Sequence, residues 1–220
     1  MDYKFVSTFK MNFDFGMLLS VDFSSCCETA DLFNLTEEIF HEIKDCVKNK
    51  GIPDLVWFKG MGESIKYANC KEIVDLIKVT YPNQKIGVYL NCSLFKDKDI
   101  RKDFYDCDLV AINLNSIEES NFSKYNKCPK SVNSFEVLEG IREFRKEFTG
   151  NLGIYTLFLR GLNDTPENVW ELKNFLLEVN PDHYSVSNYT LDGFRPLSDK
   201  FKDFLREALK DLPFKVMYMI

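Results

Sequence analysis

Residues 55–63 read LVWFKGMGE, and the interpretation of the whole chain starts from this stretch. The apolar run 55–58 is typical of a buried strand, and it ends in two glycines and a carboxylate. Because Gly60 and Gly62 lack a Cβ, a ligand can approach this backbone closely, and Glu63 can accept hydrogen bonds from an ammonium group. The stretch therefore predicts a strand whose exit faces a ligand.

Strand-like and helix-like patterns alternate along the rest of the chain. Apolar runs predict strands at 17–23, 55–58, 86–90, 109–114, 152–159, 183–187 and 214–218. Apolar residues at helical spacing predict helices between them, at about 36–47, 73–77, 100–105, 134–148, 165–179 and 201–209. Thr36 and Thr165 are the expected helix N-caps, and Pro166 suits a first helical turn.

Alternation on this scale predicts parallel strands joined by right-handed helical crossovers, hence an α/β fold. Six such repeats are too few for a closed eight-unit barrel, so we expect an incomplete (β/α)6 barrel with helices outside, in one domain spanning residues 1–220. An open doubly wound sheet has the same periodicity and stays an alternative. In either fold, ligands bind at the carboxyl ends of the strands.

Composition limits the classes of partner. The net charge is −6 and the sequence pI is about 5.1, so we expect no direct nucleic-acid binding. No stretch approaches the roughly 18 apolar residues of a membrane span, and no leader pattern opens the chain, so we expect a cytoplasmic protein without membrane contact. The seven cysteines are widely spread in a chain of this size and are expected to be reduced thiols.

Five segments, in order and spacing, resemble motifs of the radical S-adenosylmethionine (radical SAM) superfamily, and the resemblance extends over most of the chain. They are GMGE at 60–63, LNCSL at 90–94, AINLN at 111–115, FLRGLND at 158–164 and FRPLS at 194–198. The resemblance implies that Gly60, Gly62 and Glu63 hold the amino group of the methionine moiety of SAM. The other candidate cofactor-binding residues are Asn91, Asn113, Asn115 and Arg160.

Each candidate also has a plain structural interpretation. Asn113 and Asn115 can hydrogen-bond a ribose, whereas Asn115 also suits a turn. Arg160 can pair with a carboxylate or phosphate, and its structural alternative is a salt bridge to Asp164. Glu63 can equally cap the helix that follows it. The two histidines, His41 and His183, are expected at the surface or in a capping role.

The cysteine motif that defines the superfamily is incomplete in this chain. Radical SAM enzymes place Cys-x3-Cys-x2-Cys after the first strand, because three thiolates each hold one iron of a four-iron, four-sulfur cluster. If Cys26 is the first ligand, Ala30 and Phe33 stand where the second and third should be. A rearranged metal site would draw on the loop cysteines Cys26, Cys27, Cys92 and Cys128, whereas Cys46, Cys70 and Cys107 are expected to be structural.

Two functional hypotheses follow. In the first, the chain has lost the standard cluster and acts as a non-catalytic binding or partner subunit, with a retained site for SAM or another small metabolite. In the second, it is an active radical SAM enzyme with a non-standard cysteine set, which cleaves SAM reductively to a 5′-deoxyadenosyl radical. A third hypothesis is an ordinary barrel enzyme. It ranks last because the sequence contains no recognisable phosphate loop, no obvious nucleophile and base pair, and no histidine-rich metal site.

Overall fold

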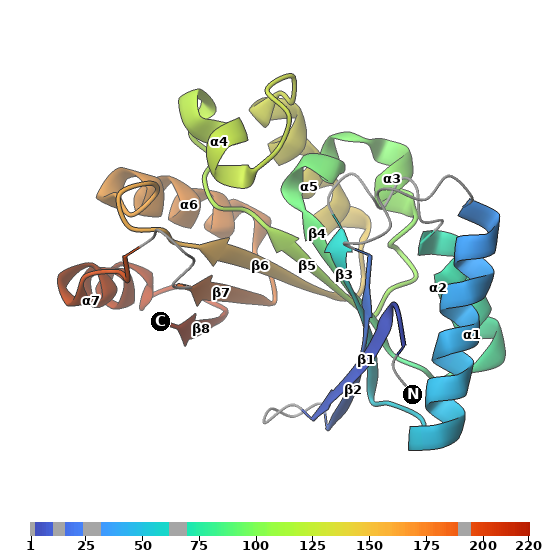
Figure 1. The fold of residues 1–220 in the computed structure, drawn as a ribbon. Helices are drawn as coiled ribbons and strands as arrows, with labels where there is room; N and C mark the ends of the chain where they lie inside the picture. Colours follow the sequence, from blue (N-terminus) through green and yellow to red (C-terminus); the bar gives the residue numbers. More distant parts are fainter. Residues whose placement is uncertain (1–2, 11–15, 24–31, 62–69, 189–194) are drawn as a thin grey trace. The chain divides into compact units, whose positions relative to one another are not determined.

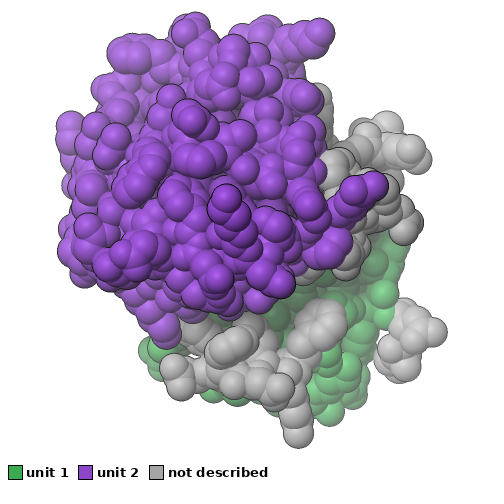
Figure 2. Space-filling model, turned by 90° about the vertical axis from the view of Figure 1, so that its left-hand side faces the viewer, with its two compact units in different colours: residues 1–90, 99–110 green, residues 91–98, 111–220 purple. Residues whose placement is uncertain are grey.

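The computed structural model describes the chain except for residues 1–2, 11–15, 24–31, 62–69 and 189–194. The described residues fall into two compact units, which Figure 2 shows in different colours. Unit 1 comprises residues 1–90 and 99–110, and unit 2 comprises residues 91–98 and 111–220. Among the described helices, none is long and apolar enough to cross a membrane.

One sheet contains the eight described strands, arranged in the order in which they occur in the sequence (Figure 1). Their bounds are β1 Val6–Lys10, β2 Met17–Asp22, β3 Leu55–Met61, β4 Ile86–Asn91, β5 Leu109–Asn113, β6 Asn151–Leu157, β7 His183–Ser187 and β8 Lys215–Met219. Strand β1 runs antiparallel to β2, whereas β2–β3, β3–β4, β6–β7 and β7–β8 pair in parallel. The sheet does not close on itself, so the expected α/β fold with an incomplete barrel is confirmed.

In unit 1, helices α1 (Leu32–Lys50) and α2 (Cys70–Thr80) cover one face of the strands (Figure 1). Ile39 and Ile43 of α1 and Ile73 and Ile77 of α2 are completely buried, as are alternate strand residues such as Phe58. Burying one such side chain stabilises the fold by about 1.5–3 kcal/mol. The helical stripe predicted from the sequence is therefore the core of this unit.

Unit 2 contains the short 3-10 helix η3 (Cys92–Lys96) and the helices α4 (Phe122–Asn126), α5 (Ser134–Glu147), α6 (Pro166–Val179) and α7 (Asp199–Leu209). Helix η3 packs on α5 through an edge-to-face contact between Phe95 and Phe144, whose ring centroids lie 5.1 Å apart. This contact fixes the chain immediately after β4. Helix α6 begins as predicted, because Thr165 Oγ1 accepts a hydrogen bond from Asn168 N at 3.2 Å and Pro166 follows it.

Several element boundaries differ from the sequence prediction. Thr36 is not an N-cap but lies buried inside α1, because Leu35 extends the apolar stripe toward the N-terminus. Strand β6 ends at Leu157 rather than Leu159, since the amide of Leu159 donates to Asn163 Oδ1 at 2.7 Å. Strand β1 was not predicted. The short helix predicted at 100–105 is α3 (Lys98–Lys102), which follows η3. The connection after β5 contains η4 (Glu119–Asn121) as well as α4.

Candidate functional site

The described candidate residues lie at or after the carboxyl ends of strands. Asn91 and Asn113 are the last residues of β4 and β5, and Asn115 and Arg160 follow β5 and β6. All four belong to unit 2, whereas Gly60 lies within β3 of unit 1. Gly62 and Glu63, predicted to bind the ligand amino group, and Cys26 and Cys27 lie outside the described residues.

Asn113 and Asn115 form a reciprocal amide pair. Asn113 Nδ2 donates to Asn115 Oδ1 at 3.1 Å, and Asn115 Nδ2 donates to Asn113 Oδ1 at 3.2 Å. Asn113 Nδ2 also lies 3.4 Å from the carbonyl oxygen of Tyr155 on β6. Both amide hydrogens of Asn113 therefore have acceptors, while one lone pair of its Oδ1 remains for a donor outside the pair. Asn113 is half-buried, so solvent or a ligand can reach it.

The side chain of Asn115 has no hydrogen-bonding capacity left. Besides the pair with Asn113, its Oδ1 accepts from Leu157 N at 2.9 Å and its Nδ2 donates to Tyr125 O at 2.9 Å. Two donors and two acceptor positions are thereby used, and the residue is 6% exposed. Asn115 joins the end of β6 to α4 through residues distant in sequence.

Three further asparagines, none of them chosen from the sequence as a ligand residue, complete this polar cluster. Asn126 is fully buried: its Oδ1 accepts from Asn115 N at 2.6 Å, and its Nδ2 donates to Ser116 O at 2.7 Å and to Phe122 O at 3.0 Å. Asn163 Nδ2 and Asn168 Nδ2 both donate to Asn115 O, at 3.0 and 3.1 Å. These bonds fix the loops after β5 and β6 to each other.

The sequence contained a signal for only one of these three asparagines. Asn163 belongs to the segment 158–164 that carried the family resemblance, whereas Asn126 lies in a connection with no motif. Asn168 Oδ1 is buried and has no hydrogen-bond partner among the described residues. Buried amides of this kind cannot be distinguished in the sequence from exposed turn asparagines, because both are short polar residues near Gly or Pro.

Arg160 is exposed, and its Nη1 lies 3.5 Å from the carbonyl oxygen of Pro196. The salt bridge to Asp164, considered as its structural alternative, is not among the ion pairs of the described residues. Asp164 Oδ1 instead accepts from the amide of Gly161 at 2.6 Å, where Gly161 has a positive φ of 78°. The guanidinium of Arg160 thus remains available to an anionic group.

The described cysteines are free, and four of the five are buried. Cys92 is completely buried, its Sγ lies 3.9 Å from Asn91 Oδ1, and burial holds the pKa of its thiol well above the usual value, with Cys128 acting in the same direction. Burial also raises the pKa of the half-buried Cys128. Within the described ranges, no group of three or more His, Cys, Asp or Glu side chains is arranged to hold a metal ion. Cys46, Cys70 and Cys107 are buried.

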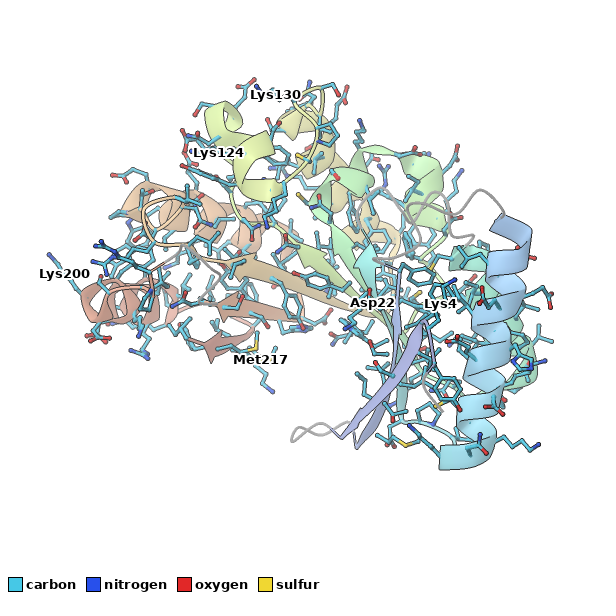
Figure 3. All side chains as sticks on the ribbon, in the orientation of Figure 1. Lys4, Asp22, Lys124, Lys130, Lys200 and Met217 are labelled. Carbon is cyan, nitrogen blue, oxygen red and sulfur yellow. The ribbon has the colours of Figure 1, made fainter. Side chains whose placement is uncertain are left out.

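At the ends of β2 and β3, an ion pair joins Asp22 to Lys59, with 3.2 Å between Lys59 Nζ and Asp22 Oδ2. The two residues are register partners in the parallel pairing of these strands, and Figure 3 labels Asp22 at the end of its strand. Lys59 directly precedes the Gly60 to Glu63 stretch, and Asp22 precedes the cysteine stretch. Neither residue belongs to a motif of the sequence.

His183 is a correction to the sequence prediction, because it is 8% exposed rather than at the surface. Its Nε2 lies 3.2 Å from the hydroxyl oxygen of Tyr155, and the two rings meet edge to face. Gly153, its register partner on β6, leaves room for the ring, since a Cβ there would overlap it. Burial lowers the pKa of His183, Lys215 lowers it further, and Asp182 opposes the shift. Burial raises the pKa of Tyr155.

No protein-family model matches the sequence. A UPF0026 protein of Helicobacter pylori strain J99 is 28% identical over 165 residues, which cover 74% of this chain and 52% of that protein. A UPF0026 protein of Methanocaldococcus jannaschii is 27% identical over 172 residues, which cover 77% of this chain and 51% of that protein. The chain therefore spans about half the length of these curated relatives.

Solved structures share the fold at lower sequence identity. A radical SAM methyltransferase from Sphaerobacter thermophilus has a TM-score of 0.61 and 14% identity, over 83% of this chain and 57% of that one. A domain of pyruvate-formate lyase-activating enzyme from Bacteroides vulgatus has a TM-score of 0.59 and 18% identity, over 74% of this chain and 97% of that one. A queuine lyase from Clostridium spiroforme, bound to SAM and queuine, has a TM-score of 0.52 and 16% identity, over 99% of this chain and 96% of that one.

Proposed function

We propose, on the premise that this chain has the fold of radical SAM enzymes, that it binds SAM or a related nucleoside metabolite and serves as a non-catalytic binding or partner subunit. In this proposal the ligand-binding side of the fold is retained, while the iron-sulfur chemistry is not.

The cysteine set carries this proposal. A four-iron cluster with one open iron needs three converging thiolates, and Ala30 and Phe33 stand at two of the three motif positions. Of the cysteines that would replace them, Cys92 and Cys128 are described, and the described residues contain no group of three or more potential metal ligands. Cys92 is completely buried, and its burial and the neighbouring Cys128 thiol both raise its pKa well above that of an exposed thiol.

Asn113 supports the retained nucleoside site. Its Oδ1 keeps one free acceptor position at the end of β5, whereas both of its amide hydrogens are used within the protein. A ligand group that meets this atom must therefore donate, as a ribose hydroxyl does. Among the structural neighbours, the queuine lyase of Clostridium spiroforme is described as bound to SAM.

Arg160 supports an anionic end on the same ligand. Its guanidinium is exposed after β6 and has no acidic partner among the described residues, because Asp164 is engaged by the amide of Gly161. A guanidinium forms two parallel hydrogen bonds with a carboxylate, the group at the methionine end of SAM.

Anaerobic reconstitution of the purified protein with iron and sulfide tests this proposal. We expect iron per chain near zero and no charge-transfer absorption, while the protein still binds SAM. A full cluster that disappears in Cys26→Ala and Cys92→Ala variants would overturn it. Cys46→Ala is the matched control, because Cys46 is a buried thiol on α1 far from any predicted ligand loop in sequence.

One observation favours the second candidate, an active enzyme with a non-standard cysteine set. Asn91 Nδ2 donates to Asn126 O at 2.8 Å, which brings the residues next to Cys92 and close to Cys128 together. The Cys128 thiol also contributes to the raised pKa of Cys92, so the two sulfur atoms sense each other's charge. The same reconstitution separates the candidates, since only the active enzyme would cleave SAM reductively.

A further inference from the structure

Four lysines lie exposed on unit 2, three on the connection between β5 and α5 and one on η3: Lys96, Lys124, Lys127 and Lys130. Figure 3 shows Lys124 and Lys130 pointing outward from α4 and from the loop that follows it. None of the four belongs to an ion pair of the described residues. We call these four side chains the lysine patch.

The lysine patch contrasts with the charge of the chain. Residues 122–135 contain three lysines and neither aspartate nor glutamate, in a protein of net charge −6. Lys96 belongs to the same neighbourhood, because its charge lowers the pKa of Cys128, which lies between Lys127 and Lys130 in sequence. Like charges repel each other, and an anionic partner that binds these lysines relieves that repulsion.

The backbone under the lysine patch is held in place. Fully buried Asn126 hydrogen-bonds Asn115, Ser116 and Phe122, and its carbonyl accepts from Asn91 Nδ2. Ser123 O accepts the amide of Cys128 at 3.1 Å, which closes the end of α4. A surface fixed in this way loses little conformational entropy when a partner binds.

Lys127 occupies a backbone position that does not favour lysine. Its φ of 51° lies in the left-handed region, where glycine is the residue with the least steric cost and asparagine the next. An ammonium group is therefore present at a turn that would fold more easily with no side chain. Residues held in sparsely populated backbone conformations cluster at sites of contact with ligands.

An apolar side chain adjoins the lysines in sequence. Phe135, in the first turn of α5, is 68% exposed and lies five residues after Lys130. Exposed acids border the stretch on both sides, with Glu119 before α4 and Glu136 after Phe135. The exposed phenylalanine offers a partner an apolar contact beside the lysines in the sequence.

We propose that the lysine patch and Phe135 form a docking surface for a short acidic segment of a protein partner, one that carries an apolar side chain among its carboxylates. A nucleic-acid backbone fits less well, because the net charge of −6 repels a long row of phosphates. The surface is independent of the proposed nucleoside site. Binding of an acidic peptide and binding of SAM are measured separately, so either proposal can fail without the other.

Fluorescence anisotropy with the full chain tests the docking surface. The probe is a short labelled peptide of glutamate and leucine, compared with the same peptide carrying glutamine for glutamate and with an oligouridylate of similar length. We expect the acidic peptide alone to bind, with an affinity that falls as salt rises. A glutamine peptide that binds equally well, or an oligouridylate that binds more tightly, would overturn the proposal.

Variants locate the contact. Lys127→Gly should weaken peptide binding about two- to fivefold and leave the melting temperature unchanged or higher, because glycine suits the left-handed backbone. The triple variant Lys124→Gln, Lys127→Gly, Lys130→Gln should weaken it about tenfold or more. Lys200→Gln, an exposed lysine on α7, is the matched control and should leave binding unchanged. Unchanged binding by the triple variant would contradict the assignment.

Discussion

The side-chain amides of Asn113 and Asn115 hydrogen-bond each other twice, at 3.1 and 3.2 Å, yet only one of the two residues can still bind a ligand. Asn115 uses its remaining donor and acceptor on Tyr125 and Leu157, whereas Asn113 keeps an acceptor position at the half-exposed end of β5. One residue of the pair is thus structural, and the other is the candidate ligand contact.

This division predicts unequal effects on stability. Asn115→Ala leaves the amide of Leu157 and the carbonyl of Tyr125 without partners, so we expect a loss of about 2–3 kcal/mol in the free energy of unfolding. Asn113→Ala, the matched control, should cost less, about 1 kcal/mol, because Asn115 loses one donor and one acceptor contact but keeps its bonds to Tyr125 and Leu157. Urea denaturation measures both, and equal losses would contradict the assignment.

His183 makes stability depend on pH. Burial lowers its pKa below the ordinary 6.5, so near that pH the unfolded chain binds more protons than the folded one. The free energy of unfolding should therefore be greatest above pH 6.5 and fall as the pH drops through 6.5 toward the lowered folded-state pKa. Urea denaturation across this pH range should show that the free energy of unfolding changes less steeply with pH in the His183→Gln variant than in the unchanged protein. An identical slope would show that His183 does not contribute.

Gly153 and His183 should be coupled energetically. A Cβ at Gly153 would overlap the His183 ring, so Gly153→Ala should cost about 1–3 kcal/mol. In a His183→Ala background the ring is gone, and the same change should be neutral or stabilising, since alanine suits a strand interior better than glycine. A double-mutant cycle measures the coupling, and additive effects would contradict the predicted overlap.

Thiol reactivity should follow burial. Cys128 is half-buried, whereas Cys46, Cys70, Cys92 and Cys107 are buried and have raised pKa values, that of Cys107 reaching about 12. Among these five, Cys128 should react first with iodoacetamide at neutral pH, because only thiolate attacks and access is needed. Mass spectrometry of the labelled peptides tests the order. Earlier labelling of Cys92 would contradict the burial of the β4 exit.

Periodicity was sufficient to predict most of the fold. The apolar stripe of α5 and the Thr165–Pro166 start of α6 were correctly predicted because their signals lie within one helix. Thr36 was misassigned because residues before it also pack into the core, which spacing within the helix does not reveal. His183 was misassigned because its burial depends on Gly153, a residue thirty positions away in sequence on a neighbouring strand.

The site was predictable only in part. Strand order placed Asn113 and Asn115 at the same edge of the sheet. Which of the two side chains has all its hydrogen bonds made within the protein depends on Tyr125 and Leu157, and these contacts have no sequence signature. Asn126 is the centre of the loop after β5 although no motif contains it. Hydrogen-bond partners far apart in sequence decide whether an asparagine is structural or available.

Calorimetric titration of SAM into the chelator-treated, iron-free protein tests the central claim most directly. We predict saturable binding to one site per chain without iron, weakened by Asn113→Ala and by Arg160→Gln. Binding that is absent from the iron-free protein and appears only after reconstitution with iron and sulfide would contradict the account, because it would make the cluster part of the site.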